Sequence, residues 1–236
     1  MPTALITGAS RGIGAAAARR FADADYDLLL IARPSVELDS LVQELRTPGR
    51  TVEFAGLNLT DQPAIRPVVE ELCQRGPAPD VVINNAGGAW TGPLADMPLA
   101  QWQWLIQLNL TSVFLVCQAT LPLLRQGGGG RIINVSSHAA RNAFPDWGAY
   151  CVSKAALDSL SRCLAVEEQA NGIQVSTLTL GAVNTPLWDS ETVHSSFDRR
   201  AMIPPAQAAE ALLFLAQQPT NQTITDLTLM PSAGAL

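Results

Sequence analysis

The stretch Thr3-Ala4-Leu5-Ile6-Thr7-Gly8-Ala9-Ser10-Arg11-Gly12-Ile13-Gly14 decides the fold that we predict for this chain of 236 residues. Its apolar start predicts a buried strand, and the alanine-rich segment that follows predicts a helix. Glycines between a strand and a helix let a ligand approach the free N–H groups at the positive helix end. This order predicts a loop for the pyrophosphate of a dinucleotide; a glycine turn that only tightens the corner is the alternative. The expected contacts are Gly8, Ser10, Arg11, Gly12, Ile13 and Gly14.

Strand-like and helix-like segments alternate along the rest of the chain. Strands are predicted at residues 4–7, 27–32, 51–57, 81–84, 131–136, 173–178 and 224–230. Helices are predicted near residues 12–22, 35–46, 61–75, 99–125, 147–170 and 205–217. Because the strands are apolar throughout, we expect an α/β fold: a doubly wound, seven-stranded parallel sheet with helices on both faces, the Rossmann arrangement. No repeat or linker divides residues 1–236, which predicts a single domain with a lid segment at about 185–205.

Composition excludes several classes of protein. Hydrophobic residues make up 47% of the chain, which suits one sizeable core, and the net charge of −6 offers no basic face for nucleic acid or an anionic membrane. Polar residues interrupt the apolar segment 105–124, so we expect a buried helix there rather than a membrane span. The start of the chain leaves no room for a secretion signal, which favours a cytoplasmic location. The four cysteines and two histidines lack ligand spacing, so no metal site is predicted.

The end of the second predicted strand sets the expected cofactor preference. A protein that reads NAD places Asp or Glu there to accept from the ribose 2′-OH, whereas this chain has Arg33. A guanidinium can bind a 2′-phosphate through two hydrogen bonds, and Arg11 can approach the same group. We therefore predict NADP(H) as the cofactor. The alternative is that Arg33 is an ordinary solvated cation.

One tyrosine and one lysine stand out in the composition. Lys154 is the only lysine among fifteen cationic residues, and Tyr150 is one of two tyrosines. In a helix, residues four apart lie on one face. A neighbouring ammonium favours the ionised phenol and lowers its pKa, so the pair can exchange a proton with a carbonyl substrate. A surface contact of no consequence is the alternative.

Further motifs join this pair in a fixed order along the chain: Gly8/Gly12/Gly14, Asn84-Asn85-Ala86-Gly87, Asn109, Ser137, Tyr150/Lys154 and Gly181-Ala182-Val183-Asn184-Thr185. With them, the sequence resembles the classical short-chain dehydrogenase/reductase family over essentially its whole length. The resemblance implies that Tyr150 is the general acid/base and that Lys154 lowers its pKa and holds the nicotinamide ribose. It also implies that Ser137 binds the substrate oxygen and that Asn109 anchors a water relay, although Asn109 is otherwise explained as a buried polar residue satisfied by its own turn.

The resemblance also selects between neighbouring residues and adds cofactor contacts. Family spacing favours Ser137 over the competing Ser136, and alternation along a strand turns the two to opposite faces. Leu180 departs from the family, which often has proline there, and the segment 226–231 lacks the usual glycine-rich ending. The added cofactor contacts are Asn58, Leu59, Asn85, Ala86, Gly87, Gly181, Val183 and Thr185.

The combined expectation is an NADP(H)-dependent oxidoreductase that moves a hydride between the nicotinamide and a ketone or secondary alcohol. A 3-oxoacyl-carrier-protein-type reductase and a non-catalytic NADP(H)-sensing protein remain alternatives. The family implies a homodimer or homotetramer. Aromatic pocket walls would favour an apolar or aromatic ketone, but a core or subunit contact explains each of them equally well. The candidate walls are Trp90, His138, Phe144, Trp147, Trp188 and His194.

Overall fold

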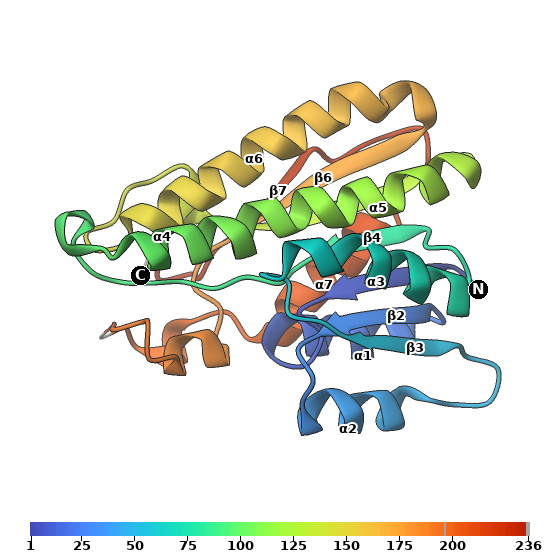
Figure 1. The fold of residues 1–236 in the computed structure, drawn as a ribbon, viewed down its shortest axis with the longest axis horizontal. Coiled ribbons are helices and arrows are strands. Elements are labelled where there is room, and N and C mark those ends of the chain that lie inside the picture. Colours follow the sequence, from blue (N-terminus) through green and yellow to red (C-terminus); the bar gives the residue numbers. More distant parts are fainter. Residues whose placement is uncertain (196, 235–236) are drawn as a thin grey trace.

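A computed structural model describes residues 1–195 and 197–234 and shows seven strands in one parallel sheet (Figure 1). The order across the sheet is β3-β2-β1-β4-β5-β6-β7, which confirms the predicted doubly wound arrangement. Strand order reverses between β1 and β4: the chain continues from β1 toward β2 on one side and from β4 toward β5 on the other. The strand bounds are β1 Thr3–Thr7, β2 Asp27–Ala32, β3 Val52–Gly56, β4 Val81–Asn84, β5 Gly130–Ser137, β6 Ile173–Leu180 and β7 Asp226–Leu229.

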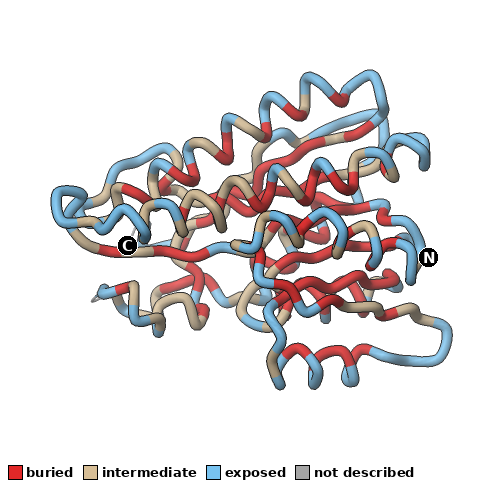
Figure 2. Tube along the Cα trace, in the orientation of Figure 1, coloured by how far each residue is buried: buried red, intermediate tan, exposed pale blue. Residues whose placement is uncertain are grey.

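Helices cover both faces of the sheet, so β1, β2 and β4 are buried along their whole length and β5 and β6 along most of theirs (Figures 1 and 2). Each face has its own apolar core, because continuously apolar strands present side chains in both directions. One core is covered by α1 (Gly12–Asp23), α2 (Val36–Leu45) and α7 (Pro205–Ala216). The other is covered by α3 (Gln62–Arg75), α5 (Ser112–Gln126) and α6 (Gly148–Glu168).

The long helix predicted at residues 99–125 is built of three pieces. It consists of α4 (Leu99–Ile106), a π-helical segment η2 (Gln107–Thr111) and α5. By length and composition Leu99–Gln126 is long and apolar enough to cross a membrane, with a mean hydropathy of 1.4, but half of that window is buried inside the fold. Its packing against α3 and α6 is that of a core helix. π-helical turns are often found at functional sites.

Short 3-10 helices form much of the surface at the carboxyl edge of the sheet. Two strands run further toward this edge than predicted, since β5 reaches Ser137 and β6 reaches Leu180. The extra residues carry side chains of the predicted site into the sheet itself. The 3-10 segments at this edge are η1 (Leu94–Asp96), η3 (His138–Ala140), η5 (Pro186–Asp189) and η6 (Arg199–Ala201), whereas η4 (Gln169–Asn171) directly precedes β6 at the opposite edge.

Candidate active site

Glycines shape the loop between β1 and α1. Gly8 and Gly12 have positive φ angles of 67° and 57°, which side-chain-bearing residues rarely adopt. A Cβ on Gly14 would lie 2.1 Å from the Gly8 carbonyl oxygen, so α1 starts directly against the loop. The Asn85 amide donates to the carbonyl oxygens of Thr7 (2.9 Å) and Gly8 (3.3 Å). No side chain caps α1, which leaves its first N–H groups open to a ligand.

A cleft of about 570 Å³ follows the carboxyl edge of the sheet from the β1 loop toward the end of β6. Nearly all predicted cofactor contacts lie on its wall. The exception is Gly14, which is buried beneath the glycine loop instead. The predicted contacts on the wall are Gly8, Ser10, Arg11, Gly12, Ile13, Arg33, Asn58, Leu59, Asn85, Ala86, Gly87, Tyr150, Lys154, Gly181, Val183 and Thr185.

Two exposed cations, Arg11 and Arg33, stand at the end of the cleft next to β2 and β3. Within residues 1–195 and 197–234, neither has a carboxylate within ion-pair distance. Their guanidinium groups are therefore available to an anion. Asn58 is partly engaged, since its Oδ1 accepts from the backbone N–H of Thr60 at 3.2 Å, while the neighbouring Leu59 is buried.

Lys154 is held deep in the fold, only 5% exposed. Its Nζ donates to the Val135 carbonyl oxygen at 2.9 Å and lies 5.8 Å from the centre of the Tyr150 ring. Burial lowers the pKa of Lys154 to about 8, and the carboxylate of Asp158 opposes that fall. With a pKa of about 8, the side chain is mostly an ammonium at neutral pH and loses its proton at mildly alkaline pH.

The pKa of Tyr150 differs from the sequence expectation. We expected the neighbouring ammonium to lower it, but burial raises the pKa of Tyr150, with the Ser137 hydroxyl acting in the opposite direction. Burial is the largest cause of this rise, and the Lys154 ammonium, which donates to the Val135 carbonyl, is not among the groups that shift the pKa of Tyr150. A raised pKa keeps the phenol protonated at neutral pH, which is the form that donates a proton.

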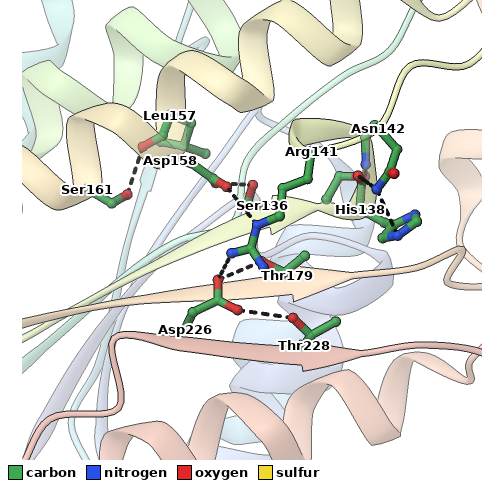
Figure 3. A network of polar contacts seen from close by, with 12 residues as sticks. Ser136, His138, Arg141, Asn142, Leu157, Asp158, Ser161, Thr179, Asp226 and Thr228 are labelled. Atoms are coloured by element: carbon green, nitrogen blue, oxygen red, sulfur yellow. Dashed lines mark hydrogen bonds and ion pairs between the residues drawn. The ribbon is translucent and has the colours of Figure 1, made fainter.

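Alternation along β5 separates the two serines at its end. Ser136 is 3% exposed and its hydroxyl donates to Asp158 on α6, as Figure 3 shows. Ser137 is more open and lies on the cleft wall with Tyr150. Its Oγ accepts from the N–H of Ala139 at 3.1 Å, so its own proton remains free to donate. Only Ser137 offers its hydroxyl in this way.

Asn109 lies in the π-helical segment and is fully buried. Its side chain accepts from the N–H of Gly88 and donates to the Gly88 carbonyl, both at 2.9 Å. A third bond runs from Nδ2 to the hydroxyl of Ser153 at 3.0 Å, between Tyr150 and Lys154. Asn109 therefore joins the loop after β4 to α6. Its partners lie outside its own helical turn, so the alternative that this turn satisfies the side chain is wrong.

An aromatic row forms the wall next to Tyr150. The ring centres of Trp147 and Tyr150 are 5.4 Å apart, and Trp188 follows Trp147 at 5.6 Å. Phe197 continues the row, 5.6 Å from Trp188. The indole N–H of Trp188 donates to the Val183 carbonyl at 2.8 Å, which fixes that ring in the wall.

The fold and this arrangement agree with a comparison against known families. The short chain dehydrogenase family model matches residues 2–195. The chain belongs to the short chain dehydrogenase family. It is therefore an oxidoreductase of that family, with the order of motifs and the doubly wound sheet typical of its members.

Individual short chain dehydrogenases are similar over nearly their whole length. Sulfoacetaldehyde reductase 2 of Chromohalobacter salexigens is 33% identical over 242 residues, covering 98% of this chain and 94% of that protein. The 3-oxoacyl-acyl-carrier-protein reductase FabG of Thermotoga maritima is 32% identical over 224 residues, covering 92% and 91%. A metagenomic short-chain oxidoreductase solved in complex with NADP is 30% identical, with a TM-score of 0.84, covering 98% and 97%.

Two of the aromatic walls predicted for this short chain dehydrogenase lie elsewhere. Trp90 is not on the cleft wall, because its ring packs over Gly92, where a Cβ would come within 2.5 Å of it. His194 is exposed outside the cleft, and its backbone N–H donates to Thr91. Sequence reasoning missed a number of wall residues with large side chains, among them Trp104, Leu108, Phe197 and Met230. The first two are spaced by one helical turn and precede Asn109, so helical periodicity could have found them.

The segment predicted as a lid is tied down at its base and at its tip. At the base, the N–H of Asn184 donates to the Ile203 carbonyl at 2.9 Å. At the tip, Thr192 donates to the Ala89 carbonyl at 2.7 Å and accepts from the N–H of Thr91 at 2.8 Å. These bonds hold the segment beside the loop that follows β4.

In the part of the chain that the structure describes, no three acidic, His or Cys side chains cluster as metal ligands would.

Leu180, which stands where the family often has proline, is followed by a turn that the surrounding structure constrains. Leu180 continues β6 and pairs with Ser137 on one side and Leu229 on the other. A Cβ on the next residue, Gly181, would lie 2.5 Å from Pro231. The sheet and the packed residues after β7 therefore constrain this turn, although the chain lacks the proline that the family resemblance leads us to expect there.

Proposed function

We propose that the chain is an NADP(H)-dependent oxidoreductase that transfers a hydride between the nicotinamide and a ketone or secondary alcohol. The supporting observation is that Tyr150, Ser137 and Lys154 share one cleft with a glycine loop shaped for a pyrophosphate. The NADP complex of the metagenomic relative agrees with this cofactor. When bound, the dinucleotide supplies or accepts the hydride.

The residues of the glycine loop fit such a cofactor. Gly8 and Gly14 leave no room for a Cβ, and the uncapped start of α1 presents N–H groups to the pyrophosphate. Arg11 and Arg33 are the cations that would bind a 2′-phosphate, because neither forms an ion pair among the described residues; Glu37 attracts Arg11 only from a longer distance. An acidic residue at position 33 would instead suit a free 2′-hydroxyl.

Proton transfer is assigned to the side chains around Tyr150. Its raised pKa keeps the phenol protonated, so it donates to the substrate oxygen during reduction. Ser137 orients the same oxygen with its free hydroxyl proton. Lys154 provides the nearby positive charge that favours the phenolate left behind, and Asn109 holds α6 against the loop after β4.

The wall of the substrate end favours an uncharged carbonyl compound with an aromatic or apolar substituent. Its large side chains are the aromatic row and, from α4 and η2, Trp104 and Leu108. The cations on the cleft wall, Arg11, Arg33 and Lys154, all belong to the cofactor contacts or the proton-transfer group. An anionic substrate such as a sulfonate would find no further cation there among the described residues.

The 3-oxoacyl-carrier-protein-type reduction is the second candidate, supported by the similarity to FabG of Thermotoga maritima.

A further part of the proposal is assembly with a second copy of the chain. Phe114 on α5 and Val152 on α6 are 45% and 44% exposed, and both helices lie on the same face of the sheet.

Loss of NADPH absorbance with a panel of carbonyl compounds tests the proposal. The panel pairs aryl ketones with aliphatic ketones, sulfonated aldehydes and a 3-oxoacyl thioester. We expect turnover that Tyr150→Phe reduces by about 1000-fold or more while NADPH affinity stays within about twofold. NADPH binding without turnover of any compound would favour the sensing role, and full activity of Tyr150→Phe would contradict the role given to this phenol.

A further inference from the structure

A polar seam joins α6 to β5 directly beside the candidate site. Its α6 residues are spaced by four and three positions, so they lie on the face of the helix that also carries Tyr150. Ile132 of β5 and Leu157 and Leu164 of α6 belong to the apolar core on this face, so the polar groups lie next to apolar side chains. The seam consists of the Val135 carbonyl with Lys154 (2.9 Å), Ser136 with Asp158, and Asn134 with Ser161 (2.8 Å).

Asp158 is the buried carboxylate in this seam, 5% exposed. Ser136 donates to its Oδ1, and Nε of Arg141 lies 3.8 Å from its Oδ2 (Figure 3). A buried carboxylate is costly unless hydrogen bonds and an opposite charge compensate it, and these two residues supply both. Asp158 is not on the cleft wall, so it does not touch a ligand there.

Arg141 connects Asp158 to the edge strand of the sheet. Its Nη2 pairs with Asp226 on β7. Asp226 is itself fixed, because it accepts from Thr179 on β6 at 2.9 Å and from Thr228 on β7 at 3.0 Å. Figure 3 shows the chain of contacts from α6 through Arg141 to the two strands.

The segment 137–140 lies between two residues that Asp158 contacts. Ser136 precedes it and Arg141 follows it, so both of its ends are tied to one carboxylate on α6. We propose that Asp158 is a positioning residue: through Ser136 and Arg141 it holds this segment so that Ser137 faces Tyr150. The inference rests on the proposed function, in which those two hydroxyls act on one substrate oxygen.

The charges around the seam support the same role. The titratable neighbours of Lys154 are Tyr150 and Asp158, and Asp158 also faces Arg141, which Asp226 holds from the other side. The Asp158 carboxylate raises the pKa of Lys154 against the larger effect of burial. Because that charge raises the pKa of Lys154, we expect its removal to lower the pKa further, so that the ammonium is lost at a lower pH.

Two substitutions separate positioning from charge. Asp158→Asn removes the charge and the ion pair with Arg141, whereas Ser136→Ala removes one hydrogen bond and keeps the charge. We expect both to lower kcat by about tenfold or more, with KM and NADPH affinity within about threefold. Only Asp158→Asn should move the alkaline limb of the pH profile to lower pH. Glu70→Gln, which breaks an exposed pair with Arg66 on α3, is the control and should change nothing.

A second readout does not depend on turnover. Because the chain contains a single lysine, an NMR titration of isotope-labelled lysine reports Lys154 alone. Its pKa should fall in Asp158→Asn and stay unchanged in Ser136→Ala and Glu70→Gln. A wild-type chain without carbonyl turnover would contradict the proposed function, whereas an unchanged Lys154 pKa in Asp158→Asn would overturn the inference. Unchanged kcat in a folded Ser136→Ala, measured in an active wild-type background, would also overturn it.

Discussion

Replacing Asn109 with alanine should destabilise the fold as well as the site. The Asn109 amide is the side chain that bonds both the N–H and the carbonyl of Gly88, next to the cleft residue Gly87. Ser153 keeps a partner after the change, because its hydroxyl also donates to the Tyr150 carbonyl at 2.8 Å. The substitution therefore leaves two buried backbone groups without a partner, at about 1–3 kcal/mol each.

The expected loss is thus about 2–6 kcal/mol in the free energy of unfolding. For a chain of this size, each kcal/mol lowers Tm by about 2–4 °C, so Tm should fall by roughly 4–24 °C. Differential scanning calorimetry measures the change. Saturating NADPH should recover part of it, because the loop that Gly88 belongs to lines the cleft.

Thr120→Val is the matched control for this measurement. Thr120 is fully buried in the same helical run, but its hydroxyl bonds only to the Val116 and Cys117 carbonyls of its own helix. Removing that hydroxyl should cost about 1 kcal/mol. If Asn109→Ala lowers Tm no more than Thr120→Val does, Asn109 does not hold the Gly88 loop, and its role would be limited to the water relay that the family resemblance implies.

Two further predictions concern the two ends of the cleft. Arg33→Asp should weaken NADPH binding by about tenfold or more and leave NADH binding nearly unchanged, because the new carboxylate repels a 2′-phosphate. Fluorescence titration with both nucleotides measures this, and an unchanged ratio of affinities would make Arg33 an ordinary surface cation. Trp188→Ala should raise KM for an aryl ketone by roughly 5- to 30-fold but have little effect on a small aliphatic ketone, since about 1–2 kcal/mol of aromatic contact is lost. Phe214→Ala on the exposed face of α7 is the control, and equal effects on both ketones would argue against an aromatic substrate wall.

Much of the fold could be predicted because its signals are local. The central strands β1, β2 and β4 are short apolar runs, and their burial on both faces follows from that composition. Gly8, Gly12 and Gly14 could likewise be assigned, since their backbone angles and close contacts arise within one loop. The spacing of Tyr150 and Lys154 placed both side chains on one helix face for the same reason.

Other features depend on neighbours that are distant in the sequence. Trp90 and Trp188 both lie in connections that follow a strand, yet only Trp188, in η5, lies on the cleft wall, where its indole N–H donates to the Val183 carbonyl. The pKa of Tyr150 rises rather than falls, because burial in the folded chain disfavours the charged phenolate. Local spacing carries no information on how deeply a side chain is finally buried.

The sequence by itself determined the order of strands and helices, the glycine loop and the residue types available for proton transfer, because these follow from hydrophobic pattern and backbone freedom. Only the tertiary structure decided that Ser136 turns to Asp158 and that Asn109 joins two separate elements across the site. Those contacts arise when β5, α6 and the loop after β4 pack together. A buried polar group must find its partner there, whatever its distance along the chain.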